Sequence, residues 1–238
     1  ADGVSGAELV AAGWPHGSAP AGAQTFTGNG AAFAAQCPAD MVVELTTLDP
    51  RNGQPALDTI RAALGAGRHV VTANKGPIAH AYRELSALAQ ARGVALRFES
   101  TVMDGTPIFS MMDACLPVTE VLGFRGPLNS TSNYVLGRMA GGETLEQAVA
   151  TAQALGIAEA DPSNDLDGWD AAVKATVLAN VLMGVDLRPH DIVREGLGAA
   201  AMRQAHQSLA PGSGVLKQLV AAECTARGVA VRVALVAL

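Results

Sequence analysis

The chain has 238 residues, of which 49% are hydrophobic and 16% are charged, a composition typical of a folded globular protein with one large or two small domains. Its net charge of −6 disfavours binding to nucleic acid or to an anionic membrane surface. It has no apolar run of the roughly 20 residues that span a membrane and no signal-peptide or disulfide pattern, so we expect a cytoplasmic protein.

The first part of the chain, residues 1–104, alternates short apolar strands with amphipathic helices. A short helix is expected over 6–12. Strands are then predicted over 40–47, 68–76 and 94–100, and helices over 56–67 and 81–93. Strands that alternate with helices of this length indicate βαβ units and a parallel sheet. We therefore predict a doubly wound, Rossmann-like nucleotide-binding domain of the α/β class.

This nucleotide-binding domain is expected to be incomplete. Such domains open with a strand and a GxGxxG turn that holds the pyrophosphate, and the sequence contains no such motif. The stretch "GNGAAF" at 28–33 has two glycines at the first spacing but lacks the third and follows no strand. The first βα unit is thus absent, and we expect the sequence to be an excerpt of a longer protein.

The second part, residues 105–238, is predicted to be an α+β domain for substrate binding and dimerisation. Its elements are helices over 107–116, 131–139, 145–155, 169–183 and 213–228, and strands over 118–126 and 229–238. Thr144 and Gln147 form a plausible capping box for the helix that starts at 145. Asn129 and Asn133 are expected to cap a helix rather than to contact a ligand.

The stretch "EADPSNDLDGWDAAVK", residues 159–174, gathers five carboxylates ahead of one lysine. A calcium loop is one interpretation, because Ser163, Asp165 and Asp167 fall at the first three ligand positions and Gly168 at the sixth. Lys174 then occupies the twelfth position, where the loop needs a bidentate Glu. The lysine defeats this interpretation.

Two interpretations of the acidic stretch remain. In the first, the charges only stabilise a helix: Asp167 caps it, and Asp170 and Lys174 form an i,i+4 pair worth about 0.2–0.5 kcal/mol. In the second, the apolar stripe of Val173 and Val177 places Lys174 near the packed side of the helix. A lysine that carboxylates hold charged and oriented can give a proton to a neighbouring substrate oxygen.

Four segments together resemble one enzyme family, the homoserine dehydrogenases. The acidic stretch, read as "AEADPSNDLDGWDAAVK", resembles the substrate-binding signature of that family. The other three segments are "VVTANKGPIA" at 70–79, "FESTVMDGTPI" at 98–108 and "GPLNSTSNYVL" at 126–136. The resemblance covers roughly residues 40–235. It implies the reversible interconversion of L-aspartate 4-semialdehyde and L-homoserine with NADP or NAD, by a homodimer.

The resemblance also implies roles for individual residues near the substrate. Lys174 is expected to donate the proton to the aldehyde oxygen. Glu159 and Asp170 are expected to bind the amino-acid end and the hydroxyl group, with Asp165 in support. Lys75 is expected to approach both the nicotinamide and the substrate.

Cofactor and metal roles follow from the same resemblance. Thr46 and Thr47, at the end of a strand, are expected to lie along the cofactor together with Asn74 and Lys75. A sodium ion is implied at the hinge between the domains. Its expected ligands are the Glu99 side chain and the carbonyl groups of Val102, Asp104 and Thr106.

The sequence also departs from the family pattern. Ser130 stands where many members have glycine, and it would be strained if that position needs a positive φ. The phosphate loop and the C-terminal glycine-rich segment are both absent, which predicts weakened cofactor binding. One alternative is therefore a truncated remnant that keeps the amino-acid pocket and the dimer interface but binds no nicotinamide. Another is a different dehydrogenase on the same scaffold.

Overall fold

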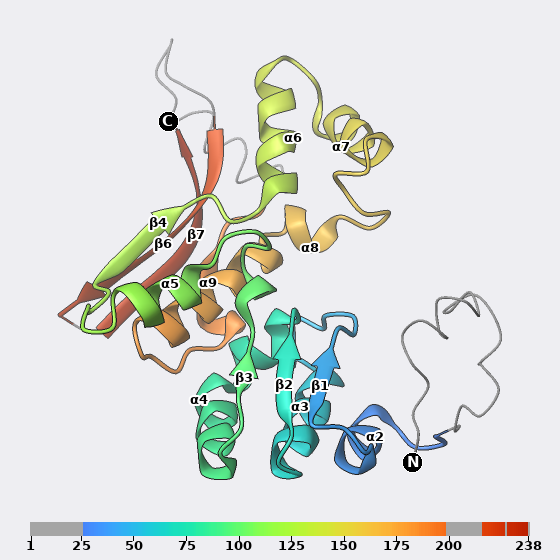
Figure 1. Ribbon diagram of the computed structural model, residues 1–238. Helices are drawn as coiled ribbons and strands as arrows, with labels where there is room; N and C mark the ends of the chain where they lie inside the picture. The colour runs from blue at the N-terminus through green and yellow to red at the C-terminus, as the bar shows by residue number, and fades with distance from the viewer. Residues whose placement is uncertain (1–25, 199–215, 227, 238) are drawn as a thin grey trace.

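The computed structural model describes residues 26–198, 216–226 and 228–237 and contains two β-sheets with helices packed around them (Figure 1). The first sheet has three parallel strands, and the second has four strands of mixed direction. This confirms the predicted fold class, an α/β unit followed by an α+β unit. The helix expected over 6–12 lies outside the described residues. None of the described helices is long and apolar enough to cross a membrane.

The first sheet is built from β1 (Met41–Glu44), β2 (His69–Thr72) and β3 (Leu96–Arg97) in that order. Helices α3 (Ala56–Gly65) and α4 (Lys75–Arg92) make the two crossovers, so the predicted βαβ units are confirmed. A further short helix, α2 (Gly30–Gln36), packs against α3. It covers part of the "GNGAAF" stretch, and sequence analysis missed it.

Helix α4 begins six residues before the predicted start, at Lys75 rather than at 81. The Asn74 side chain caps it by accepting a hydrogen bond of 3.1 Å from the backbone N–H of Gly76. Pro77 is tolerated in the first turn, where a backbone N–H needs no partner within the helix. The backbone is kinked at Ala81, where φ is −149°, so the predicted start coincides with the kink.

The second sheet has the order β4-β6-β7-β5, and the helices α6 and α9 pack on it. The bounds of its strands are β4 (Gly123–Gly126), β5 (Val193–Arg194), β6 (Leu216–Thr225) and β7 (Gly228–Ala237). Its helices are α5 (Ile108–Cys115), α6 (Ser130–Ala140), α7 (Leu145–Ala154), α8 (Ser163–Leu166) and α9 (Trp169–Leu182), with 3₁₀ turns η1 (Glu99–Thr101) and η2 (Pro189–Asp191). The predicted helices α5, α6, α7 and α9 are confirmed to within one residue at each end. The capping box of α7 is also confirmed.

The helix predicted over 213–228 is wrong, because residues 216–225 form the strand β6. Leu216, Gln218, Val220 and Ala222 are all buried, which is the period of two expected of a strand face. The alternation is hard to recognise in the sequence because Leu219, on the other face of the strand, is also apolar. Its side chain is buried as well. This segment pairs with β4 on one side and with β7 on the other, and the pairing outweighs the helix-like pattern of its sequence.

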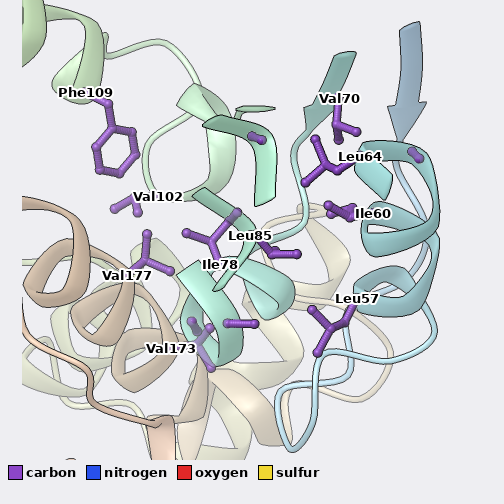
Figure 2. Close-up of a cluster of buried hydrophobic side chains, with 14 of the residues drawn as sticks. Leu57, Ile60, Leu64, Val70, Ile78, Leu85, Val102, Phe109, Val173 and Val177 are labelled. Carbon is purple, nitrogen blue, oxygen red and sulfur yellow. The ribbon is translucent and has the colours of Figure 1, made fainter. Parts of the chain in front are cut away.

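Helix α9 joins the two units. One side of it packs on β6 and β7, and another packs on α4. Val173 and Val177 of α9 belong to the same buried cluster as Ile78 and Leu85 of α4 (Figure 2). The buried Asn180 side chain also crosses the boundary, donating to the carbonyl oxygen of Ala79 at 3.4 Å. This shared core brings the N-terminal turn of α4 beside that of α9.

Candidate active site

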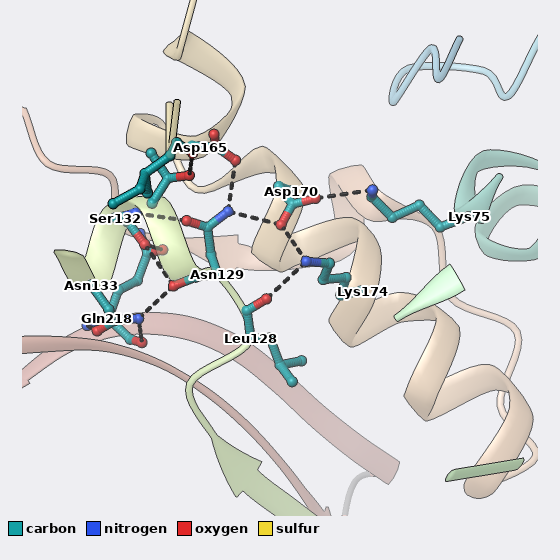
Figure 3. Close-up of polar contacts among 11 residues, drawn as sticks. Lys75, Leu128, Asn129, Ser132, Asn133, Asp165, Asp170, Lys174 and Gln218 are labelled. Carbon is teal, nitrogen blue, oxygen red and sulfur yellow. Dashed lines mark hydrogen bonds and ion pairs between the residues drawn. The ribbon is translucent and has the colours of Figure 1, made fainter. Parts of the chain in front are cut away.

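The carboxylate of Asp170 is the centre of a polar cluster between the two units (Figure 3). Its Oδ1 atom lies 3.1 Å from the Nζ of Lys75, and its Oδ2 atom lies 2.9 Å from the Nζ of Lys174. Asn129 Nδ2 donates a third contact, 2.8 Å to Oδ2. The side chain of Asp170 is only 12% exposed. One carboxylate thus holds one lysine from each unit.

The electrostatics of the cluster keep Asp170 ionised. Burial on its own raises the pKa of this carboxyl, because a low-dielectric surrounding disfavours the charged form. The ammonium groups of Lys75 and Lys174, with hydrogen bonds from Lys174 and Asn129, outweigh burial and lower the pKa below its ordinary value. Asp170 is therefore a carboxylate at neutral pH.

The local backbone explains how the cluster forms. Lys75 is the first residue of α4, three residues after the end of β2, and Asp170 is the second residue of α9. Gly168 precedes α9 with a φ of +78°, in the left-handed region that favours glycine. The predicted cap by Asp167 is wrong, because Gly168 is the N-cap and Asp167 ends α8 instead. The acidic stretch is therefore a turn between two helices.

Asn129 has two roles. Its Oδ1 accepts a 2.7 Å hydrogen bond from the backbone N–H of Ser132, so the expected cap of α6 is confirmed. Its Nδ2 also donates to Asp165 Oδ1 at 2.7 Å, in addition to Asp170. The amide therefore joins two carboxylates of the acidic stretch, which sequence analysis did not predict.

Two neighbours of Asn129 differ from expectation. Asn133 does not cap a helix: its Oδ1 accepts from the backbone N–H of Gln218, and its Nδ2 donates to the carbonyl oxygen of the same residue. Ser130 is the first residue of α6, and no described non-glycine residue has a positive φ. The strain considered for Ser130 is therefore absent.

A pocket of about 690 Å³ lies against the two lysines. Lys75, Lys174 and Asn129 line it, together with the segments 100–106 and 127–130. The ammonium of Lys174 also donates to the carbonyl oxygen of Leu128 at 2.9 Å, so two acceptors orient it at the pocket wall. Such a wall suits a small polar substrate with a carbonyl or hydroxyl oxygen.

The structure does not bring every predicted ligand residue into this cluster. Glu159 is exposed, and its backbone carbonyl accepts from Gln153 Nε2 at 3.1 Å. Thr46 and Thr47 are also exposed, just beyond β1, and neither lines the pocket. Asn74 is buried and donates to the carbonyl oxygen of Thr46 at 3.1 Å. The ligand roles of these residues stay predictions.

The predicted sodium ligands are divided between two places. Glu99 accepts hydrogen bonds from the N–H of Phe109 and from the N–H and hydroxyl of Ser110, at the start of α5. Although burial opposes ionisation, these bonds lower the pKa of the Glu99 carboxyl. Val102, Asp104 and Thr106 line the pocket beside Lys75 and Lys174. Glu99 lines a different pocket, at the start of α5. The sodium site stays a prediction.

Two buried polar residues near the site were not predicted. Gln218 on β6 is 1% exposed, accepts from Ser132 Oγ at 2.8 Å and donates to the carbonyl oxygen of Glu195 at 3.0 Å. Glu44, the last residue of β1, is 3% exposed. A charged residue that ends an apolar run was a signal that could have marked Glu44.

Comparisons with known proteins show which family this chain resembles. The family model described as "Homoserine dehydrogenase" matches residues 107–238, and the one described as "Homoserine dehydrogenase, NAD binding domain" matches residues 15–99. A relative from Pseudomonas canavaninivorans, named NAD(+)-dependent homoserine dehydrogenase, is 45% identical over 166 residues, which cover 70% of this chain and 47% of the relative.

Two solved structures are similar as well. A putative homoserine dehydrogenase from Archaeoglobus fulgidus has a TM-score of 0.74 and 30% identity, over 87% of this chain and 62% of that one. A hyperthermophilic archaeal homoserine dehydrogenase in complex with NADPH has a TM-score of 0.72 and 28% identity, over 90% and 61%. The chain spans about half the length of the curated relatives it matches. It belongs to the homoserine dehydrogenase family.

Proposed function

We propose that this chain carries the catalytic site for the reversible, nicotinamide-dependent reduction of L-aspartate 4-semialdehyde to L-homoserine. The observation that carries the proposal is the double pairing of Asp170 with Lys75 and Lys174. It joins a lysine at the edge of the nucleotide-binding sheet to a lysine of the second unit, beside one pocket. A reaction between a cofactor and an amino-acid substrate needs that meeting of two binding units.

Lys174 is the proposed proton donor. Its contacts with Asp170 and with the Leu128 carbonyl use two of the three hydrogens of the ammonium. The third hydrogen is available to an oxygen in the pocket. As the aldehyde carbon gains a hydride, its oxygen takes this proton from Nζ, and in the reverse direction the amine accepts it.

The carboxylates form the proposed amino-acid site. Asp170 and Asp165 are tied by one amide and thus present fixed acceptors for an ammonium or a hydroxyl. Glu159 lies on the exposed part of the same stretch and would complete the site on contact with the substrate. The acidic character selects substrates that carry an ammonium group over simple aldehydes.

The bound nicotinamide would supply the hydride. Thr46, Thr47, Asn74 and Lys75 are proposed to line its path, because the carboxyl ends of β1 and β2 meet at this edge of the sheet. One similar protein is named NAD(+)-dependent and another was solved with NADPH, so both cofactors are candidates.

Two measurements test the proposal. The purified chain should oxidise NADH or NADPH when aspartate semialdehyde is added, and a non-amino aldehyde should be a poorer substrate. Preferred turnover of the non-amino aldehyde would indicate a different dehydrogenase. A fluorescence titration with each reduced cofactor should show saturable binding. If neither cofactor gives a saturable signal, the chain is a truncated remnant and the catalytic proposal is wrong.

A homodimer through the second sheet is part of the proposal. The face of this sheet turned away from α9 carries a shallow hollow of about 520 Å³, lined by Ala221, Arg232 and Ala234 among others. Sedimentation velocity should show a dimer, and Ala221→Glu should yield monomers.

The proposed sodium ion is testable in the same samples, since replacing sodium with choline should lower the melting temperature.

A further inference from the structure

Glu44 is a buried carboxylate that the reaction scheme does not use. It ends β1 and is 3% exposed, and three donors reach it. Its Oε1 accepts from the backbone N–H of Thr46 at 2.7 Å and from the Thr46 hydroxyl. Its Oε2 accepts from the Thr72 hydroxyl at 2.9 Å. Its partners are therefore polar groups of two neighbouring strand ends.

The carboxylate determines the direction of the next hydrogen bond. The Thr72 hydroxyl donates to Glu44 Oε2, so its hydrogen points at Glu44. A lone pair of the Thr72 oxygen then accepts from the backbone N–H of Asn74, at 2.9 Å. Asn74 in turn caps α4 and donates to the Thr46 carbonyl. The bonds close a ring between the ends of β1 and β2.

Lys75 directly follows this ring. Its backbone lies between Asn74 and Gly76, which are joined by the 3.1 Å capping bond. Its ammonium lies 3.1 Å from Asp170 in the other unit. Figure 1 shows β1 and β2 ending at the same end of the first sheet, the end that faces the second unit. The position of this ammonium thus depends on how the turn after β2 is held.

We propose that Glu44 is a positioning residue, which locks the two strand-end turns together and so sets the place of Lys75 and of the cofactor edge at Thr46. A purely structural glutamate would need only satisfied hydrogen bonds. A glutamine would either set its N–H₂ group against the backbone N–H of Thr46 or make the Thr72 hydroxyl accept instead of donate, so it could not keep all three contacts in their present direction. The cofactor part of this inference rests on the proposed function, whereas the part on Lys75 does not.

The test uses the small number of lysines in the chain, which are Lys75, Lys174 and Lys217. Lysine labelled with carbon-13 at Cε gives three side-chain signals, assigned by single lysine-to-arginine variants. In Glu44→Gln the Lys75 signal should move or broaden while the Lys217 signal stays in place. The Kd for reduced nicotinamide should rise about tenfold, the loss expected for one hydrogen bond to a charged group.

A second pair of variants covers the case in which Glu44→Gln does not fold. Thr72→Val removes the hydroxyl link and should move the Lys75 signal, whereas Thr72→Ser keeps the hydroxyl and should leave it in place. Glu84→Gln, an exposed change in the same unit, is the control for an altered charge. If Glu44→Gln or Thr72→Val lowers the melting temperature but leaves the Lys75 signal unchanged, Glu44 is only structural and the proposal is overturned. Absence of cofactor binding by the unmodified chain would defeat the proposed function but not the prediction for the Lys75 signal.

Discussion

Asp170 and Glu44 are both carboxylates shielded from solvent, yet they are satisfied in different ways. Asp170 contacts two ammonium groups and one amide, from three separate parts of the chain. Glu44 contacts one backbone N–H and two hydroxyl groups at the ends of adjacent strands. The first carboxylate joins charged and amide side chains beside a pocket, and the second joins the ends of two adjacent strands.

The difference indicates what each carboxylate can do. The lysines around Asp170 are 20% and 18% exposed and have flexible stems, so a charged substrate can replace one contact with another. Of the donors around Glu44, Thr72 is held by strand pairing with Glu44 itself, and Thr46 follows two residues later, just past the same strand end. The two carboxylates thus differ in the charge and exposure of their partners more than in their own burial.

The largest effect on catalysis is expected for a substitution of Lys174, one of the two lysines that contact Asp170. Lys174→Ala removes the proposed proton donor, and general acid catalysis contributes about 10²–10⁴-fold. The kcat for reduction of aspartate semialdehyde should fall within that range. Lys217→Ala removes the third lysine of the chain, away from the cluster, and serves as the matched control with unchanged kcat. A fall in kcat of only a few-fold in Lys174→Ala would show that Lys174 is not the proton donor.

The second prediction concerns Asp170→Asn, which replaces the carboxylate that two ammonium groups share with a neutral amide that has only one acceptor oxygen. Breaking a buried ion pair costs about 3–5 kcal/mol, and the partial exposure of the lysines reduces the expected loss to about 2 kcal/mol at neutral pH. Urea unfolding at neutral pH measures it.

The same variant should show a pH dependence of defined sign. The folded-state pKa of Asp170 lies below its unfolded value, so its stabilising contribution is present above the unfolded pKa of about 3.9. That contribution is lost as the pH falls through the lower, folded pKa. The difference in unfolding free energy between wild type and Asp170→Asn should therefore shrink in acid. A difference that stays constant down to acid denaturation would contradict a lowered pKa for Asp170.

Local spacing explains which parts of the cluster were predictable. Asp170 and Lys174 are four residues apart on one helix, so their pairing follows from helix geometry alone. Lys75 lies 95 residues before Asp170, and only the resemblance to a known family indicated that it belongs to the site. Glu44 was missed because its partners lie on another strand or past its own strand end.

The fold shows the same limit. The βαβ alternation and the helices α5, α6, α7 and α9 follow local periodicity, and they were predicted. Strand β6 was assigned to a helix because both of its faces carry apolar residues and neither period is distinct. The start of α4 was missed because the glycine and proline at 76 and 77 suggest a turn, although both are compatible with a first helical turn.

Smaller effects on stability and on kcat are expected from substitutions of Asn129, which links the acidic stretch to the helix α6. Asn129→Ala removes the cap and both amide contacts, and loss of a cap costs about 1 kcal/mol. Asn129→Asp keeps the capping oxygen but places a third carboxylate beside Asp165 and Asp170. It should retain the cap and still reduce kcat, because repulsion displaces the Asp170 carboxylate from Lys174. Equal kcat in Asn129→Asp and wild type would show that Asn129 acts only as a cap.

The smallest effect is expected for an exposed carboxylate, which completes the comparison. Glu84 pairs with Arg61 at 2.5 Å, but the two side chains are 52% and 38% exposed. Its pKa is lowered chiefly by the hydrogen bond from Arg61, yet solvent screening leaves such surface pairs worth about 0.2–1 kcal/mol. Glu84→Gln should lower the free energy of unfolding by no more than that at neutral pH, and this loss should become smaller as salt is added. Thermal unfolding at low and high salt measures both. A loss as large as that of Asp170→Asn would mean that charge pairing, rather than shielding from solvent, determines how much a carboxylate contributes in this chain.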